Sequence, residues 1–173
     1  MILTSLKQLN TNLFRTIILS NDTHLKSITS ILKAYIGNDW YNKEYTQRNK
    51  YEAYSEAYVF TPYLLKTKYK DVINPKTISN NELIVKLIKW EPNYEGLFHH
   101  HDNNYCYYKI LKGELNETIV NSKLKVNLEK TYKKDDIGFI CDSIGEHKIK
   151  NLSDDFSYSL HVYFKNSINI SHL

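Results

Sequence analysis

The stretch that decides the fold class is residues 105–128, YCYYKILKGELNETIVNSKLKVNL, which holds three short apolar runs separated by two close turns. The runs are rich in Tyr, Ile, Val and Leu, and the turn signals between them are Lys112-Gly113 and Asn121-Ser122. Such a pattern is typical of short antiparallel strands joined by hairpins. The predicted strands here are residues 105–111, 114–120 and 122–128.

The same pattern continues on both sides of this stretch and predicts further short strands with turn signals between them. These are residues 58–65, 82–90, 136–141, 147–151 and 157–164. Many short strands with close turns predict a mainly β domain, either a β-sandwich or a closed barrel, with helices packed on its outside.

The N-terminal part differs, because apolar side chains recur there at helical spacing. One stripe runs from Leu6 to Ile18 and a second from Leu25 to Tyr35, with Asn21-Asp22-Thr23 between them. Residues 40–58, charged and rich in tyrosine, predict a third helix or an irregular arm. We expect one domain over residues 1–173, in which a helical region (1–57) precedes the β region (58–165).

Composition argues against two classes of function. The 173 residues carry a net charge of +4, and the basic residues are too scattered to follow a nucleic-acid backbone. No run approaches the roughly 18 apolar residues of a membrane helix, and the N-terminus lacks a secretory pattern. The two cysteines are too few for a disulfide framework. We expect a cytoplasmic monomer that binds neither nucleic acid nor membrane.

Three of the seven histidines are consecutive, at positions 99, 100 and 101. Side chains alternate along an extended strand, so His99 and His101 lie on one face and His100 points to the other. Two imidazoles at this spacing inside a barrel can bind one metal ion. A surface cluster that binds nothing explains a histidine triplet equally well.

Polar and apolar residues also alternate from 159 to 164. Period two places the polar members, Ser159, His161 and Tyr163, on one face of a strand. If this face looks into the barrel, a hydroxyl, an imidazole and a phenol line the metal site. If it looks into solvent, the segment is an ordinary amphipathic edge strand.

Together these motifs resemble the cupin superfamily, small β-barrels of jelly-roll type, and within it the cysteine dioxygenases. His99, His101 and the later Gly113 resemble the first cupin motif, and His147 with Asn151 four residues on resembles the second. Three runs resemble cysteine dioxygenase sequences closely, namely residues 111–118, 142–147 and 159–163.

The resemblance implies an enzyme, a thiol dioxygenase that uses Fe(II) and O2 to oxidise a small thiol, first of all L-cysteine, to its sulfinic acid. His99, His101 and His147 would bind the iron as three neutral ligands. Cys106 stands in the region where most cupins carry a glutamate ligand. The partners implied are the small thiol and dioxygen, in cysteine catabolism.

The resemblance also implies a thioether crosslink between Cys106 and Tyr163 beside the metal. The alternative is a buried thiol near a hydrogen-bonded phenol. Tyr163 would contact the substrate or dioxygen, and His161 would orient the phenol and line the substrate site. Ser159 would hydrogen-bond His161.

One segment departs from the family, in which an arginine just upstream of the barrel binds the substrate carboxylate. Residues 60–65 have Pro62 at that position, and Arg48 lies too far upstream unless an insertion follows. The carboxylate-binding arginine is therefore not identified, and cysteamine or 3-mercaptopropionate stays open as the substrate. The alternatives to a thiol dioxygenase are a metal-binding cupin that acts as a sensor and a zinc-dependent cupin hydrolase or isomerase.

Overall fold

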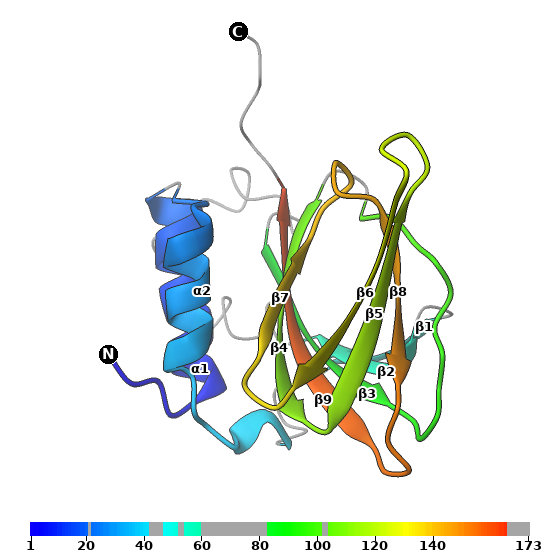
Figure 1. Cartoon of the computed structure of the whole chain (residues 1–173). Helices are drawn as coiled ribbons and strands as arrows, with labels where there is room; N and C mark the ends of the chain where they lie inside the picture. Colours follow the sequence, from blue (N-terminus) through cyan, green and yellow to red (C-terminus); the bar gives the residue numbers. More distant parts are fainter. Residues whose placement is uncertain (21, 42–46, 52–53, 60–82, 102–103, 166–173) are drawn as a thin grey trace, which may run out of the picture.

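The computed structural model describes residues 1–20, 22–41, 47–51, 54–59, 83–101 and 104–165, and Figure 1 shows how their elements are arranged. The helical elements are α1 (Leu6–Phe14), the π-helical turn η1 (Arg15–Leu19), α2 (Leu25–Ala34) and the short 3-10 helix η2 (Asp39–Tyr41). The strands are β1 (Gln47–Tyr51), β2 (Tyr54–Val59), β3 (Leu83–Trp90), β4 (Asn104–Lys112), β5 (Glu114–Asn121), β6 (Val126–Lys133), β7 (Ile137–Ile140), β8 (Glu146–Asn151) and β9 (Ser157–Lys165).

The strands form two antiparallel sheets that face each other, with the helices outside the larger one (Figure 1). The larger sheet has the strand order β1-β2-β3-β9-β4-β7, and the smaller has the order β6-β5-β8. Neighbouring strands that are distant in sequence, such as β3 and β9, pair along their full length. The predicted mainly β architecture with helices packed on its outside is confirmed.

Two predictions about elements were wrong. The third helix or irregular arm predicted at residues 40–58 is wrong for the described part of that segment, where η2 is followed by β1 and β2, so the helical region ends well before residue 57. Pairing of β2 with β3, in which Val59 lies opposite Lys86, draws this segment into the sheet. The strand predicted at 122–128 starts at Val126, because Lys125 has a positive φ of 52° and closes a longer turn. Residues 60–65 of the predicted strand 58–65 lie outside the described residues.

The two helices bury their apolar stripes against the outer face of the larger sheet. Leu9 and Leu13 of α1 and Ile28 and Leu32 of α2 are fully buried there. Burying one such side chain contributes about 1.5–3 kcal/mol, so these contacts account for the position of both helices. None of the described helices has the length and apolar character needed to cross a membrane.

Strand β9 divides its side chains between two environments. Leu160, Val162 and Phe164 are completely buried in the core beneath the helices. The residues between them therefore point to the other side, toward the smaller sheet. The polar face of β9 thus looks into the barrel and not into solvent, which decides between the two readings of its alternating pattern.

Two residues of the cupin-like motifs shape the turns beside the site. Gly113 has a φ of +82°, and a Cβ there would lie 2.0 Å from Ser157 Oγ, so the turn between β4 and β5 requires glycine. The side chain of Asn151 accepts from Ser157 Oγ at 2.8 Å and donates to the carbonyls of Trp90 and Glu91. These contacts join the ends of β3, β8 and β9.

A buried lysine connects α2 to the sheet. Lys109 of β4 is 2% exposed, and its ammonium donates to Leu32 O at 3.2 Å and to Tyr35 O at 2.7 Å. Its Nζ also lies 3.2 Å from an Asp135 carboxylate oxygen. A cation at the C-terminus of a helix is favourable, because unpaired carbonyls carry the negative end of the helix dipole.

We therefore predict that Lys109→Met lowers the free energy of unfolding by about 2 kcal/mol, since buried carbonyls lose their donor. Urea unfolding followed by circular dichroism measures this change. Lys133→Met, at an exposed position of β6, is the control and should change stability by less than about 0.5 kcal/mol. Equal stability of the two variants would contradict the role given to Lys109.

Candidate metal centre

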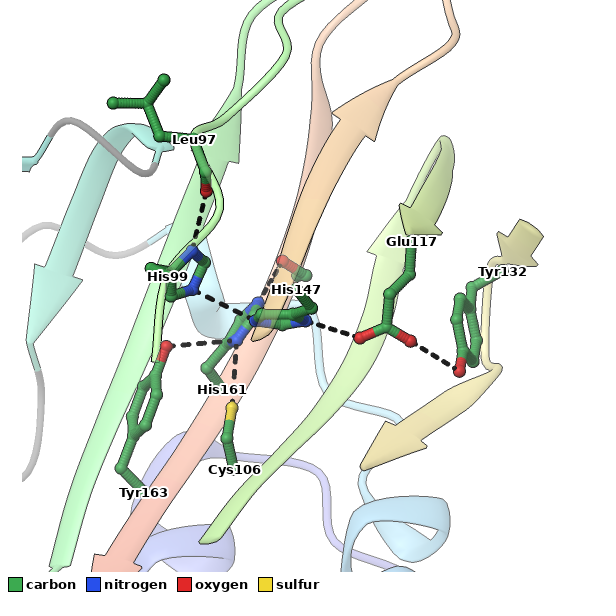
Figure 2. Close-up of polar contacts among 9 residues, drawn as sticks. Leu97, His99, Cys106, Glu117, Tyr132, His147, His161 and Tyr163 are labelled. Atoms are coloured by element: carbon green, nitrogen blue, oxygen red, sulfur yellow. Dashed lines mark hydrogen bonds and ion pairs between the residues drawn. The ribbon is translucent and has the colours of Figure 1, made fainter. Parts of the chain in front are cut away.

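Three histidines from two parts of the chain, His99, His101 and His147, converge between the sheets, and Figure 2 shows two of them, His99 and His147, with their rings facing each other. His99 and His101 belong to the connection between β3 and β4, and His147 lies on β8. One nitrogen from each ring lies within 4.8 Å of the other two. His101 and His147 are buried, and His99 is half-buried. The structure thus brings together all three residues that the sequence predicted as metal ligands.

The segment of His99 and His101 is held by backbone hydrogen bonds. The sequence analysis placed His99 and His101 on a regular extended strand. The structure instead has an isolated β-bridge between His99 and His147. His99 N donates to His147 O at 3.0 Å, and His147 N donates to His99 O at 3.2 Å. His101 N donates to Asp142 Oδ1 at 2.9 Å. His100 points away, and its Nε2 lies 2.8 Å from Glu146 Oε1 near the surface.

Hydrogen bonds fix which nitrogen of two rings faces the centre. His99 Nδ1 lies 3.0 Å from Leu97 O, and a carbonyl can only accept, so Nδ1 carries the hydrogen. His147 Nδ1 lies 2.6 Å from Glu117 Oε1. This leaves both Nε2 atoms as lone-pair donors only 3.1 Å apart, an arrangement that a cation between them stabilises. His101 Nδ1 is buried without a hydrogen-bond partner among the described residues. The three residues therefore fit a metal ion.

Two of the three histidines, His99 and His101, are held in the neutral form that binds metals. Burial, reinforced by the neighbouring His147, lowers the pKa of His99. The same causes lower the pKa of His101 to about 3. Neutral imidazoles keep their lone pairs available near pH 7, so no proton has to leave these two rings before a metal binds.

Glu117 of β5 is a residue of this centre that the sequence analysis missed. Its side chain is 0% exposed, and its two carboxylate oxygens accept from His147 Nδ1 and, at 3.1 Å, from Tyr132 OH. A carboxylate behind a metal-binding histidine fixes the ring and increases its basicity. The sequence feature that could have identified Glu117 is the alternation of side chains along β5, which places Glu117 on the same inward face as Leu115.

Ser159, His161 and Tyr163 form a line of contacts beside the three histidines, as predicted. Ser159 Oγ lies 2.8 Å from His161 Nε2, and Tyr163 OH lies 3.3 Å from His161 Nδ1. Cys106 Sγ lies 3.7 Å from the same Nδ1 (Figure 2). The Tyr163 ring stacks on the His101 ring at a centroid distance of 5.9 Å, so this group adjoins the metal centre.

Trp90 at the end of β3 is a second residue that the sequence analysis missed. Its Nε1 donates to Ser159 Oγ at 2.8 Å, and both side chains are buried. An indole nitrogen can only donate, so it orients the serine hydroxyl. No short motif marks such a tryptophan, because its partner lies on a strand 69 residues away in sequence.

The carboxylate-binding arginine of the family has no counterpart among the described side chains of the barrel. Residues 60–65, with Pro62 at the expected position, lie outside the described residues. Arg48 lies on β1, for which the structure describes only the backbone. Arg15, at the start of η1, is exposed and lies on the helical side of the molecule.

This fold with its three-histidine group defines a cupin. Oxalate decarboxylase from Bacillus subtilis shares the fold, with a TM-score of 0.51 over 69% of this chain and 28% of that chain, at 17% identity. The chain belongs to the cysteine dioxygenase type I family, whose model matches residues 13–170. Human cysteine dioxygenase type 1 is 26% identical over 151 residues, which cover 80% of this chain and 73% of the human protein. The rat protein is 28% identical over 152 residues, with the same coverage.

We predict that Glu117→Gln weakens metal binding about 10- to 100-fold, because an amide replaces the charged acceptor that holds His147 Nδ1–H. Titration with Co2+, followed by visible absorption, measures the dissociation constant. Glu129→Gln is the matched control on the neighbouring strand, where the side chain is exposed. Unchanged affinity in the Glu117 variant would show that this carboxylate does not support the site.

Proposed function

We propose that this protein is an Fe(II)- and O2-dependent thiol dioxygenase that oxidises a small thiol, L-cysteine first of all, to its sulfinic acid. The observation that carries the proposal is the three-histidine group with Ser159, His161 and Tyr163 beside it, in a member of the cysteine dioxygenase type I family. Bound Fe(II) would supply the redox chemistry by which both atoms of O2 are added to the thiol sulfur.

His99, His101 and His147 would hold the iron, and the character of these ligands suits a thiol substrate. All three are imidazoles, so the ligand set brings no negative charge to the ion. The nearest buried carboxylate, Glu117, lies behind His147 and bonds its outer nitrogen. A metal whose charge is not neutralised by its ligands attracts a thiolate and lowers the pKa of the incoming thiol.

The contacts of His161 direct the Tyr163 hydroxyl. Since Trp90 Nε1 donates to Ser159 Oγ, the serine hydroxyl can donate to His161 Nε2. Burial lowers the pKa of His161 well below its ordinary value, so the ring is neutral and carries its hydrogen on Nδ1. That N–H donates to Tyr163 OH, which leaves the phenol proton to donate to the bound substrate or dioxygen. Ser159 and His161 are positioning residues in this proposal.

Cys106 and Tyr163 are arranged for the crosslink that the family resemblance implies. They are directly opposite each other on β4 and β9, and both contact His161 Nδ1. Directly opposed residues of antiparallel strands have Cβ atoms about 4.5–5.5 Å apart. We propose that a thioether bond replaces the Cys106 S–H and one C–H of the Tyr163 ring. Two protons and two electrons are released in this step, and both would pass to dioxygen.

Protein loaded anaerobically with Fe(II) should consume O2 when L-cysteine is added, and cysteine sulfinic acid should form in equal amount. His147→Ala should lose both the iron and the activity, because two histidines leave an incomplete ligand set. An oxygen electrode and mass spectrometry of the product measure the reaction, and metal analysis measures the iron. If the iron-replete protein consumes no O2 with cysteine, cysteamine or 3-mercaptopropionate, the metal-binding cupin without catalysis is the better description.

The crosslink predicts an intact mass lower by about two hydrogens after turnover, since one S–H and one C–H are lost. Mass spectrometry of the denatured protein detects this deficit. Cys106→Ser should show no deficit under the same conditions, and Cys141→Ser is the control that should keep it. An unaltered wild-type mass after many turnovers would rule out the thioether.

A further inference from the structure

Lys86 of β3 is a cationic side chain beside the candidate metal centre. Leu83, Val85 and Leu87 of β3 point into the core beneath the helices, while Ile88 belongs to the second core cluster, between the sheets. Lys86 alternates with the outward-facing residues, so its side chain leaves the strand on the barrel side. It lies opposite His161 in the pairing of β3 with β9.

The Lys86 ammonium lies over the ring of Tyr163, 5.0 Å from the ring centroid. The Tyr163 ring is in turn stacked on His101, one of the three converging histidines. An ammonium over an aromatic face is stabilised by the ring quadrupole. This contact holds the charge of Lys86 next to Tyr163, the residue that adjoins both the histidines and Cys106.

Electrostatic effects also place Lys86 near this group. The side chain is half-buried, and burial lowers its pKa. Its positive charge is among the influences on the Cys106 thiol and on the His161 ring. A positive charge at this place attracts a negatively charged ligand group that enters the barrel beside Tyr163.

Lys89 on the same strand provides a contrast. Its Nζ lies 4.1 Å from the centroid of the Phe156 ring, which packs against the core on the helical side of the larger sheet. Lys109 of β4 also points to that side, where it binds carbonyls at the end of α2. Of these three lysines, Lys86 alone has its charge beside Tyr163.

We propose that Lys86 binds the carboxylate of the thiol substrate, so that this enzyme selects small thiols that carry a carboxylate. The inference rests on the proposed thiol dioxygenase function and adds the residue that recognises the substrate. With the thiol sulfur directed to the three histidines, a carboxylate two or three carbons away is directed to the neighbouring Lys86. A lysine offers a single point charge in place of the planar fork of an arginine. It therefore holds the carboxylate without fixing its plane.

The test compares thiols with and without a carboxylate on wild-type protein and on Lys86→Met, whose side chain keeps a similar length without the charge. Anaerobic calorimetry with Fe(II)-loaded protein gives the dissociation constants of 3-mercaptopropionate and cysteamine, and oxygen uptake gives kcat/KM for each. Lys86→Arg restores a cation, and Lys89→Met removes an outward-facing lysine from the same strand. Thermal unfolding confirms that each variant is folded.

In Lys86→Met we expect the preference for 3-mercaptopropionate over cysteamine to fall about 10- to 100-fold, in binding and in kcat/KM, since a hydrogen bond between charged groups is lost. Lys86→Arg should regain part of it, and Lys89→Met should match wild type. If wild type oxidises thiols and Lys86→Met keeps the wild-type preference, another cation binds the carboxylate and this inference is wrong. If wild type oxidises none of the thiols, the proposed function itself fails.

Discussion

The alternation of side chains along β9 is the constraint on which both the fold and the site depend. Every second residue enters the core beneath the helices, where Leu160, Val162 and Phe164 are completely buried. The residues between them must then face the smaller sheet, because successive side chains of a strand point to opposite faces of the sheet. A shift of the register by one residue would place the apolar set in the barrel and His161 under the helices. Core packing therefore fixes the orientation of the reactive face.

Burying polar side chains inside the barrel lowers the stability of the fold, and the hydrogen bonds among these side chains offset that loss. A buried histidine or carboxylate without a partner destabilises the folded state by several kcal/mol. Here Trp90 bonds Ser159, Ser159 bonds His161, and Glu117 bonds both His147 and Tyr132. The Ser159–His161 contact lies within β9, and the others join side chains from different strands. The network thus stabilises the fold and at the same time restricts the tautomers of the rings that face the metal centre.

Much of this arrangement could be predicted from sequence, because its signals are local. Period two placed Ser159, His161 and Tyr163 on one face of a strand but left open where that face looks, and the order of turns and strands indicated a β-sandwich or a closed barrel with outer helices. The convergence of His99, His101 and His147 followed the predicted motifs, although a single backbone bridge, and not a regular strand, presents the first two. Their role as ligands stays a prediction.

The remaining features depend on tertiary contacts that no local pattern reveals. Residues 40–58 read as a third helix or an irregular arm, but β2 pairs with β3 and β1 pairs with β2, so the described parts of this segment are strands. No sequence motif surrounds Trp90 or Lys86. Each comes to lie beside the polar face of β9 only because β3 pairs with β9. Glu117 stands in a run that matched the family, yet its partner His147 lies 30 residues later.

The reciprocal backbone hydrogen bonds between His99 and His147 have a consequence for how the protein acquires its metal. Because the main chain already aligns these residues, His99 and His147 are in place once β8 and the connection after β3 have come together. A metal bound by these histidines as proposed would then be captured late, by a folded scaffold, unlike the small zinc modules that are unfolded without their ion. A chelator should accordingly strip such a protein of its ion and leave an intact apoprotein, ready to be recharged.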